Sequence, residues 1–222
     1  MLLQGKIVIV SGIGPGLGQE LAVLAAAEGA GAVVLAARTA QKLDAAEQAI
    51  DALGLGTRVL KVPTDIADQA QCQALAEQTL QAFGRIDVLF NSAYDPGSFE
   101  PVAQANLDGW RRAMDVNFFG TMQLTQACIP AMIAAGGGAI VMIGTMVEHK
   151  PLATQGGYGA SKSALRSATK HLALELGQHG IRVNSCHMGW MWGPAVEGYF
   201  AWQASESGKS QQELIAEVTR NI

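Results

Sequence analysis

The chain has 222 residues, of which 49% are apolar and 15% charged, a balance that supplies a buried core for one domain. The formal net charge is −4, and Lys and Arg do not cluster, so we expect no nucleic-acid partner and no anionic-membrane surface. The three cysteines form no CxxC pair and the four histidines form no HxxxH or HxH pair. We therefore expect neither a disulfide framework nor a bound metal.

The N-terminal stretch MLLQGKIVIVSG holds an apolar run of only four residues after Lys6. Such a run is too short for a signal peptide and far too short for a membrane span. We therefore expect a cytoplasmic protein.

Short apolar runs alternate with helical patterns along the whole chain. The expected strands are 7–10, 32–36, 57–61, 87–90, 139–143 and 181–185. The expected helices are 19–28, 41–53, 68–83, 107–135 and 158–178, with a kink or break at Pro130. This alternation predicts an α/β fold with a single Rossmann-type, doubly wound parallel sheet and helices on both faces. Ligands of such folds bind at the carboxyl ends of the strands.

A glycine-rich turn, SGIGPGLG, follows the first expected strand and opens the first helix. A pyrophosphate needs close approach to the backbone and free N–H groups at a helix N-terminus, which favours small residues. We expect Gly12, Gly14, Gly16, Leu17 and Gly18 to contact a dinucleotide. The alternative is an ordinary strand-to-helix turn.

The end of the second expected strand, VVLAART, indicates which cofactor ribose the site would accept. An NAD site usually places an acidic residue there, whereas an NADP site offers an Arg to the 2′-phosphate. Ala37 occupies the acidic position and Arg38 follows it, which favours NADP(H). The alternative is a solvated Arg38 and NAD(H), since no basic residue lies inside the glycine turn.

Three further motifs make the chain resemble the short-chain dehydrogenase/reductase family from Lys6 to about Pro194. SGIGPGLG resembles TGxxxGxG, NSAY at 91–94 resembles NNAG, and Tyr158 and Lys162 match YxxxK. Asp65 in PTDIAD and Asn117 in MDVNFFG match two other family positions. The resemblance implies further cofactor contacts from Asp65, Ile66, Asn91, Ala93, Tyr158, Lys162 and Gly189.

The chain departs from the family pattern at several positions. Thr145 stands where the family has its catalytic serine, and Tyr94 where NNAG has glycine. Met188 replaces a proline, and Gly193 replaces a threonine near the cofactor. The family also continues through another helix and strand, so we expect the C-terminal strand to be missing. By resemblance we expect a homodimer or homotetramer formed through helices 107–135 and 158–178.

The resemblance implies an oxidoreductase that interconverts an alcohol and a ketone by hydride transfer to or from a nicotinamide. Tyr158 is the expected acid/base, and Lys162, one helical turn later, is expected to lower its pKa from about 10. The Thr145 hydroxyl would hydrogen-bond the substrate oxygen. Asn117 would hold a water that links Lys162 to solvent; the alternative is a role in a helix kink or cap.

The segment HMGWMWGPAVEGYFAWQ is rich in aromatic residues and methionine. We expect a substrate lid at about 188–220 in which Trp190, Trp192 and Tyr199 contact a bulky apolar ketone or alcohol, together with Tyr94 and Met146. The alternative is packing against a neighbouring subunit or a missing C-terminal part.

Two other functions share some of these motifs. Nucleotide-sugar epimerases and dehydratases also have YxxxK, but they favour a GxxGxxG turn, and the third residue after Gly12 is Pro15. A dinucleotide-binding regulatory protein could keep the cofactor pocket without catalysis, and Met188 and Gly193 are its motivation. The Tyr158–Lys162 pair favours the enzyme.

Overall fold

The computed structural model describes residues 1–220, and the chain divides into two compact units, the first Met1–Met188 and the second beginning at Gly189. The first unit carries one parallel sheet. Its strands are β1 (Ile7–Ser11), β2 (Ala32–Ala37), β3 (Arg58–Pro63), β4 (Val88–Asn91), β5 (Gly138–Thr145) and β6 (Ile181–Met188). They lie in the order β3-β2-β1-β4-β5-β6. The order reverses between β1 and β4, which is the switch point where such sheets bind ligands.

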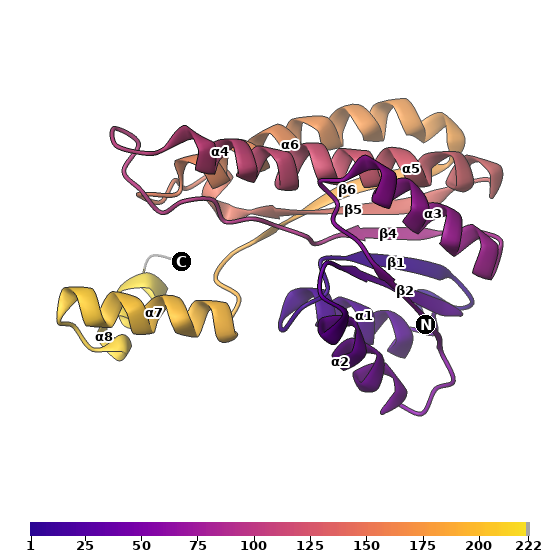
Figure 1. The fold of residues 1–222 in the computed structure, drawn as a ribbon, viewed down its shortest axis with the longest axis horizontal. Coiled ribbons are helices and arrows are strands. Elements are labelled where there is room, and N and C mark those ends of the chain that lie inside the picture. The colour runs from indigo at the N-terminus through magenta and orange to yellow at the C-terminus, as the bar shows by residue number, and fades with distance from the viewer. Residues whose placement is uncertain (221–222) are drawn as a thin grey trace. The chain divides into compact units, whose positions relative to one another are not determined.

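Helices cover both faces of this sheet, as predicted. On one face lie α1 (Leu17–Ala27) and α2 (Ala40–Asp51); on the other lie α3 (Gln69–Phe83), α4 (Leu107–Met114), α5 (Thr121–Ala134) and α6 (Gly156–Leu176) (Figure 1). The alternation of side chains along β1 explains the two layers. Val8 and Val10 pack with α1 and α2, whereas Ile9 packs with the helices of the opposite face.

The long helical stretch expected at 107–135 is present, but its irregularity lies elsewhere than predicted. A π-helical turn, Asp115–Gly120, separates α4 from α5, and α5 runs through Pro130 to Ala134. Of the kink or break expected at Pro130, the break is therefore wrong, and the kink stays a prediction. Pro130 has no N–H to donate to the preceding turn, and the helix nevertheless continues for four more residues.

The second unit contains two helices, α7 (Pro194–Ser207) and α8 (Gln211–Thr219). Pro194 begins α7 and Gly208, with φ 71°, ends it. Ser210 and Glu213 form a capping box at the start of α8. Between residues 189 and 220 no strand follows β6, and no helix within 1–220 is long and apolar enough to span a bilayer.

Candidate active site

Two glycines of the turn after β1 are required by close backbone contacts. A Cβ on Gly12 would lie 2.3 Å from the nitrogen of Ala93, at the end of β4. A Cβ on Gly18 would lie 2.1 Å from the carbonyl oxygen of Gly12. The first contact brings the turn against the neighbouring strand, and the second packs α1 onto the turn. Together they place the N-terminus of α1 at the switch point.

The tip of this turn is open. Gly16 has φ 107°, a conformation that favours glycine, and no atom lies within 4 Å of where its Cβ would be. No side chain caps α1 at Gly16. The free N–H groups and the open backbone surface fit the pyrophosphate of a dinucleotide.

A basic residue that the sequence analysis missed lies over the same turn. The Lys42 side chain of α2 comes within 3.7 Å, at Cδ, and 3.8 Å, at Nζ, of the Cβ position of Gly14. Arg38 is exposed directly after β2. Lys42 lies in the first turn of α2, four residues after Arg38, and this nearness to the end of β2 is a signal that could have identified it.

The residues expected on the adenine side lie at the ends of β3 and β4. The Asp65 side chain accepts a hydrogen bond from the Ala67 nitrogen at 3.0 Å, and Ile66 packs against Gly120 of the π-helical turn. Asn91 is buried and donates to Thr125 Oγ1 at 3.1 Å. Ala93 lies against Gly12. Ala93 thus lies against the glycine turn and Asn91 pairs with Ser11 just before it, whereas the contacts of Asp65 and Ile66 are within their own segment and with the π-helical turn.

The proposed catalytic groups come from β5 and α6. Thr145 ends β5 and is buried, and Tyr158 is half-buried in the first turn of α6. Lys162 is only 2% exposed, and its Nζ donates to the carbonyl of Ile143 at 2.8 Å. Burial lowers the pKa of Lys162 to about 8, against the opposing charge of Glu148.

The pKa of Tyr158 is raised to about 12, whereas the sequence analysis expected it to be lowered. Burial is the main cause, and the charges of Tyr94 and Glu148 act in the same direction. Hydrogen bonding by the Thr145 side chain opposes them. The lowering expected from Lys162 is not among these effects, since its ammonium is directed to the Ile143 carbonyl.

Asn117 lies in the π-helical turn and is fully buried. Its Nδ2 donates to the Asp95 carbonyl at 2.8 Å and to Ser161 Oγ at 2.9 Å, and its Oδ1 accepts from the Asp95 nitrogen at 2.8 Å. The carboxamide therefore ties the segment after β4 to α6. This geometry fits the alternative weighed from the sequence, a role in helix irregularity, and both amide N–H groups are occupied.

Thr145 begins a short 3₁₀ turn, Met146–Glu148, through a capping box that sequence reasoning did not identify. Thr145 N donates to Glu148 Oε1 at 2.9 Å, and Val147 N donates to Thr145 Oγ1 at 3.4 Å. The signal was present as Thr-x-x-Glu. Since one lone pair of Oγ1 accepts from Val147, the Thr145 O–H remains able to donate.

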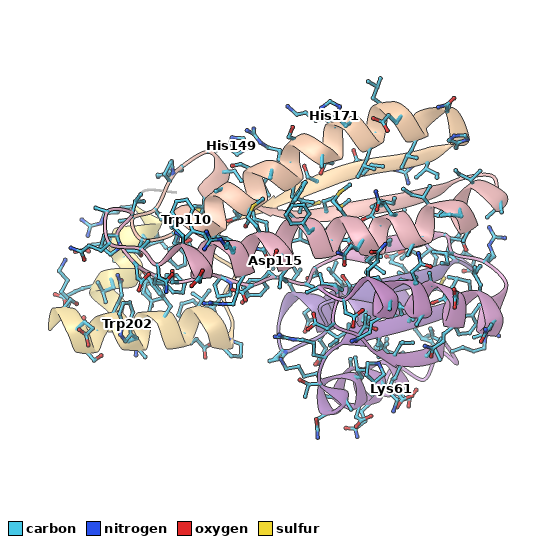
Figure 2. All side chains as sticks on the ribbon, turned by 45° about the horizontal axis from the view of Figure 1, so that its top comes forward. Lys61, Trp110, Asp115, His149, His171 and Trp202 are labelled. Atoms are coloured by element: carbon cyan, nitrogen blue, oxygen red, sulfur yellow. The ribbon has the colours of Figure 1, made fainter. Side chains whose placement is uncertain are left out.

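Among residues 1–220, one group of side chains could hold a metal ion: Glu148, His149 and His187. The ring of His187 lies 5.2 Å from that of His149, and His149 is seen beside α6 in Figure 2. Arg166 Nε lies 3.4 Å from Glu148 Oε2, however, and its positive charge disfavours a cation there. The expectation of no metal stays a prediction.

The expected substrate residues fall in both units. Tyr94 is 56% exposed, and its ring packs edge-on to that of Tyr158 at 6.4 Å. Met146 opens the 3₁₀ turn beside Thr145. Gly189, Trp190, Trp192 and Tyr199 belong to the second unit, where an aromatic cluster forms around the buried Phe200. The ring centroids of Trp190 and Tyr199 each lie within 5.5 Å of the Phe200 centroid, and that of Trp192 lies 6.3 Å from it.

A parallel sheet with a glycine turn at its switch point, and a Thr–Tyr–Lys set at the end of the fifth strand, defines a dinucleotide-dependent oxidoreductase. The family profile described as short chain dehydrogenase matches residues 6–204. The chain therefore belongs to the short-chain dehydrogenase family. It is an oxidoreductase that uses NAD(P)(H) and interconverts alcohols and carbonyl compounds.

Curated relatives and solved structures agree with this assignment. Cyclohexanol dehydrogenase of Acinetobacter sp. is 31% identical over 194 residues, which are 87% of this chain and 76% of that protein. The 7alpha-hydroxysteroid dehydrogenase of Escherichia coli K12 is 33% identical over 183 residues, 82% of this chain and 69% of that protein. The crystal structure of NAD⁺-bound xylitol dehydrogenase aligns with a TM-score of 0.87 at 29% identity, covering 92% of this chain and 78% of that one.

Proposed function

We propose that this protein is an NADP(H)-preferring oxidoreductase of a bulky, apolar secondary alcohol or ketone, with Tyr158 as the acid/base. The observation that carries this proposal is the convergence of Thr145, Tyr158 and buried Lys162 at the end of β5. When bound, the nicotinamide cofactor supplies or accepts the hydride.

Tyr158 moves the proton at the substrate oxygen. In ketone reduction its phenol, with a pKa of about 12, is fully protonated near neutral pH and donates to the carbonyl oxygen. In alcohol oxidation it must accept that proton, which requires the phenolate. The positive charge of the oxidised cofactor would favour the phenolate, whereas the ammonium of Lys162 is held by the Ile143 carbonyl and makes no such contribution. Since the raised pKa favours the protonated form, this arrangement is better suited to reduction.

Thr145 and Lys162 support this step. The Thr145 hydroxyl can donate to the substrate oxygen and so stabilise the charge that develops on it. Lys162, with a pKa of about 8, is mostly positive at pH 7 and is held in place by the Ile143 carbonyl. Asn117 fixes α6 relative to the segment after β4 through Ser161 and Asp95. We propose that Asn117 also holds a water that links Lys162 to solvent, bound through the second lone pair of its Oδ1 because both amide N–H groups are occupied.

The preference for NADP(H) rests on two cations. Arg38 follows β2 directly, and Lys42 lies over Gly14. A 2′-phosphate is a dianion that two such groups can bind together. NAD(H) remains the alternative, and the similar xylitol dehydrogenase is described as NAD⁺-bound.

The apolar substrate is supported by aromatic side chains. Tyr94 packs beside Tyr158, and the second unit offers Trp190, Trp192 and Tyr199. Related proteins are named for cyclohexanol and for a hydroxysteroid, both alicyclic alcohols. The lid role of about 188–220 stays part of this proposal.

The protein is further expected to act in the cytoplasm and to form a homodimer or homotetramer through the helices at 107–135 and 158–178. Support for the assembly comes from exposed apolar side chains on the first of these, Leu107 at 55% and Phe119 at 51% exposed. A monomer in light scattering at micromolar concentration would contradict it.

A panel of cyclic and steroidal ketones assayed with NADPH and NADH tests the proposal. We expect turnover of alicyclic ketones, with kcat/KM at least tenfold higher for NADPH. Tight NADPH binding in calorimetry without turnover of any ketone would instead support the alternative, a dinucleotide-binding regulatory protein, which Met188 and Gly193 motivate.

A further inference from the structure

The Glu148 carboxylate is the most unusual buried group of the site. Its side chain is 0% exposed, yet Oε2 accepts no hydrogen bond from any described residue. A buried carboxylate oxygen without a hydrogen bond is costly, so its presence calls for a physical reason. We look for that reason in the hydrogen bond that the other carboxylate oxygen, Oε1, accepts.

Glu148 Oε1 accepts the hydrogen bond of the Thr145 main-chain nitrogen at 2.9 Å. In return, Thr145 Oγ1 accepts from Val147 N within the 3₁₀ turn. The two bonds fix the backbone and the side chain of Thr145 at the same time. A threonine otherwise has more than one χ1 rotamer available, and only one of them directs its hydroxyl toward Tyr158.

Two residues from two other elements, Arg166 and His187, hold Glu148 in this place. Arg166, one helical turn after Lys162 on α6, lies 3.4 Å from Oε2. His187 on β6 places Nδ1 at 3.3 Å from Oε1, and its Nε2 lies 2.9 Å from Ser185 Oγ. The carboxylate therefore connects β5, β6 and the helix that bears Tyr158 and Lys162.

Gly144 provides independent support for this arrangement. A Cβ at Gly144 would lie 2.7 Å from Glu148 Oε1 and 3.0 Å from His187 Nδ1. Residue 144 pairs with His187 across β5 and β6. Only glycine leaves the room in which Glu148 and His187 approach each other.

We propose that Glu148, held in place by Arg166 and His187, is the positioning residue that fixes Thr145, and that it places a negative charge beside Tyr158 and Lys162. This inference rests on the proposed function. The titratable and charged groups that surround Glu148 are Tyr158, Lys162 and Arg166 on α6, His187 on β6, and His149 in the adjacent position. Burial dominates the pKa of both Tyr158 and Lys162; the charge of Glu148 adds to the raised pKa of Tyr158 and opposes the lowered pKa of Lys162.

Two substitutions at Glu148 distinguish its role in positioning Thr145 from the effect of its negative charge. Glu148→Ala removes the acceptor of the Thr145 N–H, and we expect kcat to fall about 10- to 100-fold with KM for NADPH within threefold of wild type. Glu148→Gln keeps an acceptor oxygen but no charge. We expect its kcat at the optimum to stay within about threefold, and the pH midpoint of alcohol oxidation to fall by on the order of half a unit, because the phenolate becomes easier to form.

Glu47→Gln is the matched control, because it also removes one ion-paired carboxylate. Glu47 pairs with Lys61, which Figure 2 shows on the opposite side of the molecule from His149. We expect its pH profile to equal that of wild type. A merely structural role of Glu148 would change the melting temperature of its variants without moving the pH midpoint.

The proposal would be overturned by a Glu148→Ala enzyme with kcat within twofold of wild type, or by an unchanged pH midpoint in Glu148→Gln. The same holds if Zn²⁺ restores activity to EDTA-treated wild type but not to Glu148→Gln, since Glu148 would then be a metal ligand with His149 and His187. If Glu148→Ala does not fold, the Gln variant alone decides. Tyr158→Phe, assayed in parallel, separates the two proposals: full activity of that variant rejects the proposed function itself.

Discussion

Lys162 donates a hydrogen bond from its ammonium to the carbonyl of Ile143 at 2.8 Å, in a site where its side chain is almost completely buried. Its pKa falls from 10.5 to about 8 as a result of burial. The folded protein thus binds this proton less tightly than the unfolded chain. Below pH 8 the group is charged in both states, and the full cost of burying the charge is present.

We therefore predict that Lys162→Met inactivates the enzyme but stabilises the fold at pH 7. The pKa shift corresponds to a cost of about 3 kcal/mol, and loss of the bond to Ile143 offsets part of the gain, which leaves about 1–2 kcal/mol. The gain should shrink as pH rises from about 8 to 10.5. Urea unfolding across this range measures it, with exposed Lys170→Met on the same helix as the control. A variant less stable than wild type at pH 7 would contradict the assignment.

Thr145 allows the hydroxyl to be tested separately from the side-chain shape. Thr145→Ser keeps the donor, so we expect kcat within about threefold of wild type. Thr145→Val keeps the shape and removes the hydroxyl, and we expect kcat to fall about 10²-fold or more. Steady-state kinetics with one alicyclic ketone and NADPH distinguish them. Equal activity of the Val and Ser variants would show that the hydroxyl does not act on the substrate.

Arg38 and Lys42 make a prediction about cofactor choice. Arg38→Gln and Lys42→Met should each raise KM for NADPH about tenfold, because each removes a charged contact worth about 1.4 kcal/mol, and leave KM for NADH within twofold. Arg182→Gln is the control, because Arg182 is an exposed residue of β6 and its loss removes one positive charge outside the cofactor turn. Parallel losses with NADPH and NADH would place these cations away from the 2′-phosphate.

Gly12 and Gly14 differ in how much space a methyl group would find. Gly12→Ala would bring its Cβ to 2.3 Å from the Ala93 backbone at φ 84°, and we expect a loss of about 3 kcal/mol in unfolding free energy. Gly14→Ala meets only the Lys42 side chain, at 3.7 Å, so its stability should stay within about 0.5 kcal/mol of wild type. Chemical denaturation of both variants tests this contrast.

The sheet could be predicted from the sequence, and so could the placement of Tyr158 and Lys162 on one helix after the fifth strand, because each rests on local patterns. Buried runs such as that of β1 have a clear signature, and YxxxK places two side chains on one helical face. Lys42 and Glu148 were missed, because their importance depends on contacts between elements distant in sequence: α2 over the glycine turn, and β6 and α6 around one carboxylate.

The direction of the Tyr158 pKa was also beyond the sequence. A Tyr–Lys spacing predicts that the two residues share a helical face, but not that Lys162 is drawn to the Ile143 carbonyl. It also gives no measure of burial, which here outweighs the neighbouring charge. The π-helical turn was missed for a similar reason. Asn117 and Gly120 meet Asp95 and Ile66, which no periodicity within the helix indicates.

The central claim is that Tyr158 transfers the proton at the substrate oxygen. Tyr158→Phe keeps the ring that packs against Tyr94 and removes only the hydroxyl. We predict that ketone reduction with NADPH falls at least 10²-fold, the lower range for loss of a general acid, while the Kd for NADPH stays within threefold. Turnover by Tyr158→Phe equal to that of wild type would contradict the account.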